Sequence, residues 1–199
     1  MKNFIYTIVT LCVILFYYSC QEKKSNAVIT DADSLKTSFS KLKDTVNQKW
    51  NNLILSDDQK FSDIKRLLDE ISYSGKFDLR LHDSLTKVLP EVLAKRYTPE
   101  NLTVKRIEDY DMETDRYIQK VLELAAKAPN LPNHPLAQEL INDINEANVN
   151  TLIKLRINYD RWAQVYNIFI EENKSQLEKI GIPADSLKKK ALFSDNSNS

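Results

Sequence analysis

The spacing of apolar residues predicts four helical segments between residues 31 and 180. In the first segment, apolar side chains recur at three- and four-residue steps, which return them to one helix face. They are Leu35, Phe39, Leu42, Val46, Trp50, Leu53, Ile64, Leu67 and Ile71. Thr30 or Asp31 is placed to cap the start and Gly75 the end, with no proline between them. The pattern predicts one helix of about 43 residues, roughly 65 Å long at 1.5 Å per residue.

Two shorter helices are expected next. The apolar residues of the first are Leu81, Leu85, Val88, Leu89 and Val92. Pro90 lies among them and predicts a kink or a break, because proline lacks a backbone donor and crowds the preceding turn. The following helix is expected to begin at Thr98, a capping residue before Pro99. It should end at the proline-rich stretch APNLPNHP, residues 128–135.

The last segment is expected to be one helix from Leu136 to Ile180, closed by Gly181. Its apolar stripe is Leu140, Ile144, Ala147, Leu152, Leu155, Tyr159, Trp162, Tyr166, Phe169, Leu177 and Ile180. Two long helices that flank two shorter ones predict an all-α fold, a long antiparallel four-helix bundle. In such a bundle, near-parallel packing covers each apolar stripe along its full length.

Composition supports this fold and narrows the possible partners. The chain of 199 residues contains two glycines, which argues against a β-rich fold with many tight turns. Its length favours one domain around one sizeable core. Its formal net charge is zero. Nucleic acid is therefore not an expected partner, because binding it requires a clustered cationic surface.

The first twenty residues have the layout of a bacterial export signal. Lys2 precedes an apolar run that extends through Phe16, and small Ser19 stands directly before Cys20. The run is short for a membrane span, which needs about 20 apolar residues. The arrangement resembles a lipoprotein signal, which implies cleavage before Cys20 and a diacylglyceryl group on its thiol. Tyr17 stands where such signals usually have Leu, so an uncleaved span and ordinary secretion remain alternatives.

These features define an expected domain layout. We expect a lipoprotein-type signal peptide over residues 1–19, a flexible tether over 20–30, a helical bundle over 31–193 and a disordered tail over 194–199. A diacylglyceryl anchor would hold the bundle firmly at a membrane, because stable anchoring takes at least two acyl chains. The expected location is the bacterial cell envelope, outside the cytoplasm, with the membrane and an unknown envelope protein as partners.

The last helical segment contains LIKLRINYDRWAQVYNIFI, in which an Arg is followed by one Tyr three residues on and by Tyr-Asn seven residues later. This pattern resembles the signature of the LemA family, bacterial membrane-anchored helical-bundle proteins. Asp160 stands where the family has Asn. The residues that match the family motif are Trp50, Asn150, Arg156, Tyr159, Tyr166 and Asn167. The resemblance implies a long-helix bundle held at a membrane and carries no established reaction.

The motif residues have two interpretations each. Tyr159 and Tyr166 return to one helix face after two turns, which favours packing in the bundle core, with an aromatic ligand pocket as the alternative. Arg156 is expected to pair with a carboxylate on a facing helix, with ligand capture as the alternative.

The sequence contains no recognisable catalytic or metal-binding motif. The residues three before His82 and His134 are leucines, so the Glu-x-x-His pairs of a di-iron bundle site do not occur. Nor does a G-x-S-x-G nucleophile motif. The acidic pairs 57–58 and 171–172 are interpreted as solvated faces. The stretch SLKKKALF, residues 186–193, is interpreted as a solvated end, with contact to anionic lipid as the alternative.

These observations predict a non-enzymatic, lipid-anchored helical-bundle protein of the cell envelope, a protein-interaction or scaffold module. We expect no metal and no cofactor. The alternative is a small-ligand sensor or carrier with a pocket in the bundle near Arg156 and Tyr159.

The anchor is testable by the mass of the N-terminal peptide of protein purified from detergent. We expect a peptide that begins at Cys20 and is heavier by a lipid, because signal cleavage and acylation both occur at that residue. The Cys20→Ala variant is the control and should lack the added mass. An intact, unmodified N-terminus from Met1 would mean an uncleaved span instead.

Overall fold

The computed structural model describes residues 22–147 and 151–194, whose regular secondary structure is helical, with no β-strand among them. The predicted all-α class is confirmed. The helices are α2 (Glu22–Tyr73), α3 (Leu79–Ala94), α4 (Val104–Ala126), α5 (Pro135–Glu146) and α6 (Leu152–Lys179). Short 3-10 turns, η1 (Leu131–Asn133) and η3 (Ala184–Leu187), lie before α5 and after α6.

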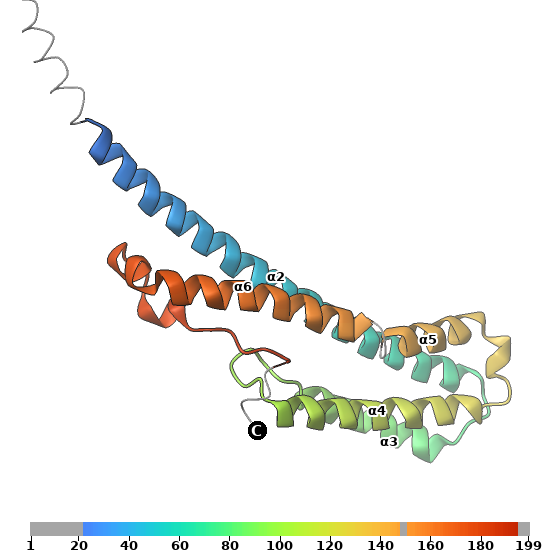
Figure 1. Ribbon diagram of the computed structural model, residues 1–199. Helices are drawn as coiled ribbons and strands as arrows, with labels where there is room; N and C mark the ends of the chain where they lie inside the picture. The colour runs from blue at the N-terminus through green and yellow to red at the C-terminus, as the bar shows by residue number, and fades with distance from the viewer. Residues whose placement is uncertain (1–21, 148–150, 195–199) are drawn as a thin grey trace, which may run out of the picture.

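Helix α2 contacts each of the helices α3, α4, α5 and α6. Helices α5 and α6 lie against it one after the other, and α3 and α4 lie side by side and also contact it (Figure 1). After α6, the chain turns back and runs toward the middle of the molecule, along the side of α6 (Figure 1). The N-terminal part of α2 projects beyond the other helices (Figure 1). Packing therefore covers α2 over much of its length, but from different helices in different parts.

The C-terminal end of α2 lies where the sequence predicts it, but the N-terminal end does not. Gly75 follows the helix with a φ of 77°, a conformation that glycine adopts without strain, so the predicted end is confirmed. The start is not at Thr30 or Asp31, because the helix already begins at Glu22. The expected flexible tether over residues 20–30 is therefore wrong from Glu22 onward. No proline or glycine lies between 22 and 30, so nothing in that stretch stops the helix from extending.

The two middle helices differ from their predicted forms at Pro90 and at Thr98. Helix α3 continues through Pro90 to Ala94, so the chain does not break there. Packing of Leu85 and Val92 against the rest of the core offsets the lost backbone hydrogen bond. Helix α4 begins at Val104, later than expected, because Thr103 provides the N-terminal cap by accepting from the backbone N–H of Arg106.

In the described residues, the predicted helix over 136–180 corresponds to the α-helices α5 and α6, and residues 147 and 151 between them are π-helical. The expected stop at Gly181 is confirmed, because α6 ends at Lys179 and Gly181 has a φ of 88°. Residues 148–150 lie outside the described residues. The stretch between the helices, ANVNT, contains no proline or glycine and so showed no strong break signal.

The apolar side chains form two cores that meet at the middle of α2. One core combines the C-terminal half of α2 with α3, α4 and α5. The other combines the N-terminal half of α2 with α6 and the chain after it. Trp50 on α2 and Phe193 near the chain end are partly buried against both cores. These two rings therefore join the cores into one hydrophobic interior.

Within the described residues, no helix combines the length and the apolar character that crossing a membrane requires. The predicted signal peptide and Cys20 lie outside the described residues, as do residues 195–199 of the predicted tail.

The core face of α2 is testable with a matched pair of leucines. Leu67 is fully buried, whereas Leu55 on the same helix is 64% exposed. We expect Leu67→Ala to lower the free energy of unfolding by about 2–5 kcal/mol, because it leaves a cavity. Leu55→Ala should change it by less than about 0.5 kcal/mol. Urea unfolding of both variants measures this, and equal losses would contradict the assignment of the core face.

Candidate functional site

Four aromatic rings from different parts of the chain meet where the two cores join. Trp50 comes from α2, Tyr97 from the α3–α4 loop, Tyr159 from α6 and Phe193 from the C-terminal segment. The Phe193 ring is stacked on Trp50 with 6.0 Å between centroids, and meets Tyr97 and Tyr159 edge-on at 5.4 and 5.6 Å. Trp50 also meets Tyr159 edge-on at 5.3 Å. We call these four residues the aromatic cluster.

Arg156 lies beside the aromatic cluster and is held on several sides. Its two terminal nitrogens donate to both carboxylate oxygens of Asp111 on α4, at 2.7 and 2.6 Å. One of them also donates to the Tyr97 hydroxyl at 2.8 Å, and the guanidinium carbon lies 5.1 Å from the centre of the Phe193 ring. The predicted ion pair with a carboxylate on a facing helix is therefore confirmed.

The charge states around Arg156 follow from burial and from these partners. Burial by itself lowers the pKa of Arg156, but the hydrogen bonds with Asp111 and the nearby charges outweigh it and raise the pKa. Burial raises the pKa of Tyr97 to about 12, although the charge of Arg156 opposes that rise. At neutral pH, Arg156 is charged and Tyr97 is a neutral phenol. Both groups serve as fixed hydrogen-bonding partners at that pH.

A second polar group lies in the core next to the aromatic cluster. Asp57 is 4% exposed, and its carboxylate lies 2.8 Å from Lys60 Nζ and 2.8 Å from Arg96 Nε. It also accepts a hydrogen bond from the hydroxyl of Tyr110, whose ring meets Tyr97 at 5.5 Å. We call Asp57, Lys60, Arg96 and Tyr110 the buried charge cluster. Burial, and then the charge of Asp57, raises the pKa of Tyr110, so this hydroxyl is protonated and donates.

The buried charge cluster corrects the interpretation of residues 57–58 as a solvated face. Asp58 is exposed and pairs with Arg96 at 2.7 Å, but Asp57 points into the core. The reason is helical spacing, because Asp57 lies four residues after buried Leu53 and four before buried Phe61. The other acidic pair, residues 171–172, is exposed as expected.

The motif residues of α6 bind the end of the chain. We call residues 184–194 the C-terminal strap. The hydroxyls of Tyr159 and Tyr166 donate to the carbonyls of Ala191 and Ser186, at 3.1 and 3.0 Å. The interpretation of residues 186–193 as a solvated end is wrong, since these bonds hold its main chain on α6.

The residue that follows each tyrosine completes the attachment. The Asn167 amide donates to the carbonyl of Lys190 at 2.8 Å and accepts from its N–H at 2.7 Å. The Asp160 carboxylate accepts from the N–H groups of Phe193 and Ser194, at 2.8 and 2.9 Å. Two carboxylate oxygens can accept from two N–H groups, whereas an asparagine side chain has only one oxygen. The Asp that replaces the expected Asn is therefore suited to this contact.

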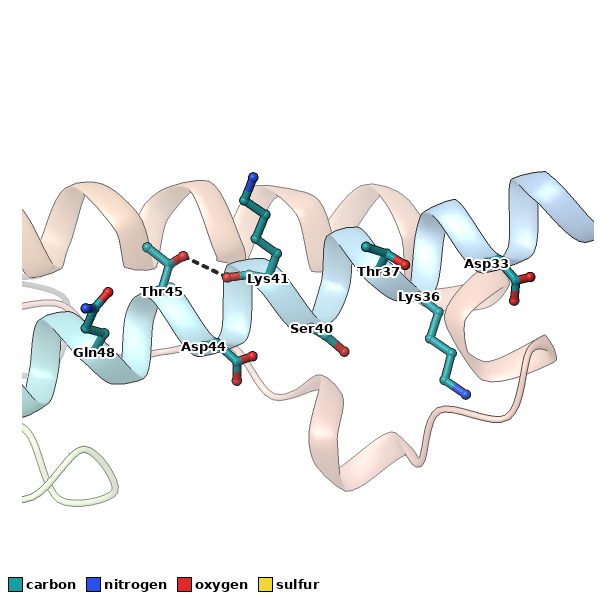
Figure 2. A pocket seen from close by; sticks show the side chains of 8 residues that line it. All are labelled: Asp33, Lys36, Thr37, Ser40, Lys41, Asp44, Thr45 and Gln48. Carbon is teal, nitrogen blue, oxygen red and sulfur yellow. Dashed lines mark hydrogen bonds between the residues drawn. The ribbon is translucent and has the colours of Figure 1, made fainter.

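Surface hollows are present near these elements, and their linings differ. One of about 870 Å³ is a shallow strip of polar side chains, all from successive turns of α2 (Figure 2). Its acids, Asp33 and Asp44, and its bases, Lys36 and Lys41, balance in charge. A hollow of about 410 Å³ between α4 and α5 has a mainly apolar lining. A smaller one of about 240 Å³ touches the aromatic cluster at Trp50 and Tyr159.

The structure brings together five of the six predicted motif residues along one seam. Trp50, Arg156 and Tyr159 meet at the junction of the cores, and Tyr166 shares with Tyr159 the role of binding the strap. Asn167 binds the same strap further along it. Cys20 and Asn150 lie outside the described residues. Among the described residues, no group of three or more His, Cys, Asp or Glu side chains is arranged to hold a metal ion.

Sequence reasoning missed several residues of this seam. Asp57 had a detectable signal, because a charged residue in register with an apolar stripe is often buried with partners. Tyr97 and Arg96 lie in a connection between helices, and nothing in their spacing indicated contact with α2 or α6. Phe193 lies in the stretch interpreted as a solvated end, and its insertion between the cores depends on the turn at Gly181.

Comparisons with models of protein families, with curated proteins and with solved structures found no match to this chain.

The role of Arg156 is testable by a substitution that keeps its charge. We expect Arg156→Lys to lower the free energy of unfolding by about 1–3 kcal/mol, because an ammonium cannot reproduce the paired bonds to Asp111. Arg161→Lys, at an exposed position on the same helix, should change it by less than about 0.5 kcal/mol. Urea unfolding compares the two, and similar small changes would show that Arg156 has no structural role.

Proposed function

We propose that this chain is a non-enzymatic, lipid-anchored helical-bundle protein of the bacterial cell envelope that binds another protein along the outer face of α6. The observation that carries this proposal is a row of exposed aliphatic side chains on that helix. They are Ile153, Ile157, Val165 and Ile168, each between 43% and 64% exposed. We call these four residues the outer stripe.

The outer stripe lies on one helix face, with exposed Arg161 between Ile157 and Val165. At 100° per residue, its four positions fall within about 120° of one another around the helix, on the side away from buried Tyr159, Tyr166 and Ile170. Single exposed apolar residues are common on protein surfaces. Grouped ones rimmed by polar residues are typical of interaction sites. The grouping supports a surface that a partner covers.

The charges beside the outer stripe indicate the chemistry of the partner. Lys154 and Arg161 are exposed on the same side of α6. A partner helix with its own aliphatic stripe and with acidic residues beside it would match both the apolar surface and the two cations. We therefore propose an amphipathic helix of an envelope protein as the partner element.

The architecture and the anchor are parts of the same proposal. We propose that α2, α3, α4 and the α5–α6 pair form a long antiparallel four-helix bundle of the LemA type. The contacts of α2 with α5 and α6, and of α3 with α4, support this arrangement. The projecting start of α2 (Figure 1) would place the bundle a short distance from a lipid on Cys20. Residues near the membrane would then be those of α2, and the outer stripe would remain accessible.

The alternative function, a small-ligand sensor or carrier near Arg156 and Tyr159, has one observation in its favour. The hollow at Trp50 and Tyr159 is bordered by the polar residues Asn47, Asn51 and Lys190. Its volume, about 240 Å³, is below the roughly 300–1,000 Å³ of ordinary ligand pockets. Arg156 is already bound by Asp111 and Tyr97, which leaves it less available to a ligand. We therefore prefer the protein-binding function.

The outer stripe is testable by cross-linking in intact cells followed by peptide identification. We expect Ile157→Arg to reduce partner cross-links at least about tenfold, because it places a charge in the apolar contact and a tenfold loss corresponds to about 1.4 kcal/mol. The matched control is Leu55→Arg, because Leu55 and Ile157 are both 64% exposed. The control should leave the cross-links unchanged.

Two results would contradict this function. One is the absence of any reproducible partner with several cross-linking reagents. The other is an equal loss of cross-links in the two variants, which would mean that the outer stripe has no special part in binding.

A further inference from the structure

We propose that the inner side of α6, which holds the C-terminal strap, is a binding site for an extended peptide, and that the strap occupies this site in cis. The peptide that fits carries an aromatic residue three positions after the residue whose main chain pairs with Asn167. This inference is independent of the function proposed above, because it concerns Tyr159, Asp160, Tyr166 and Asn167 and not the outer stripe.

The first support is that four α6 side chains recognise the strap through its main chain. Six hydrogen bonds join Tyr159, Asp160, Tyr166 and Asn167 to backbone groups of Ser186, Lys190, Ala191, Phe193 and Ser194. Bonds to main-chain groups do not depend on the identity of the bound residues. This is how proteins bind extended peptides, with affinity from the backbone and specificity from a few side-chain pockets.

The second support is that only some of the strap side chains are buried in the site. Phe193 enters the aromatic cluster and lies under the Arg156 guanidinium, and Leu187 is 4% exposed. By contrast, the side chains of Lys188 and Lys189 are 77% and 58% exposed. The site therefore selects an apolar residue and, six positions later, an aromatic residue. It tolerates variation at Lys188 and Lys189, whose side chains are exposed.

The third support is that the strap can leave without breaking an α-helix. Within the described residues, no main-chain to main-chain hydrogen bond is formed by the strap beyond the 3-10 turn η3. The strap follows Gly181, whose left-handed φ of 88° makes the turn that directs the chain back along α6. Its displacement would therefore break side-chain contacts, including those of Phe193 with both cores, and leave the hydrogen bonds within the α-helices intact.

The test is the binding of a fluorescently labelled peptide with the sequence of residues 184–194 to the full-length chain, measured by fluorescence anisotropy. In the wild-type chain, the strap competes with the peptide. Phe193→Ala removes the anchor of the strap but leaves every α6 residue of the site intact. We expect the peptide to bind this variant roughly tenfold more tightly or better, because apparent affinity scales with the fraction of open sites.

Two controls connect binding to this site. Adding Asn167→Ala to the Phe193→Ala variant should remove the gain, because it deletes both bonds to the main chain of the peptide. A peptide with Ala in place of its Phe should bind neither chain. Ile157→Arg, on the outer stripe, should leave peptide binding unchanged, so failure here is distinguishable from failure of the proposed partner surface.

A second variant covers the case in which Phe193→Ala does not fold. Lys190→Pro keeps the aromatic cluster filled and removes the N–H that donates to Asn167. It should also strengthen peptide binding. Equal affinity of the wild type and both variants, or a gain that survives Asn167→Ala, would overturn the proposal. Loss of folding in both variants, measured by circular dichroism, would overturn it too, because the strap would then be an integral part of the core.

Discussion

The length of α2 is the constraint on which the rest of the structure depends. A helix of 52 residues is not stable in water by its own hydrogen bonds, and its apolar face needs cover along most of its length. No other helix among the described residues is long enough to provide that cover alone. Helices α5 and α6 together span the stretch, and α3 and α4 add to one half of it. The division into two cores follows from this serial packing.

Two kinds of interaction, aromatic contacts and ion pairs, hold the junction between the two cores. Stacked and edge-on rings of the aromatic cluster supply a large buried area, and Arg156 ties α6 to α4 through Asp111. The buried charge cluster adds polar contacts between α2 and the α3–α4 region. Buried ion pairs contribute little net stability, because desolvation offsets their attraction. Their geometric demands favour one register of α2 against its neighbours, since a shifted helix would separate Asp57 from Arg96 and Tyr110.

Different sides of helix α6 make different contacts. One side packs on α2 through Tyr159, Tyr166 and Ile170. The adjoining side binds the C-terminal strap through Asp160 and Asn167. The opposite side carries the outer stripe, for which we propose a helical partner. A tyrosine followed by an Asp or Asn, repeated after seven residues, serves the first two sides at once. Each tyrosine ring is buried while its hydroxyl and the next side chain reach the strap.

The sequence by itself determined the helical class, the apolar faces and the ends at Gly75 and Gly181. These are local properties, because helical periodicity and a left-handed glycine depend on residues near one another in the chain. Local signals also misplaced the starts of α2 and α4, since a possible cap does not compel a helix to begin. Only the tertiary structure decided which partners Asp57 meets in the core, that Phe193 joins the two cores and that Asp160 binds the strap. Those outcomes depend on which distant segments meet, and the chain's spacing does not encode such meetings.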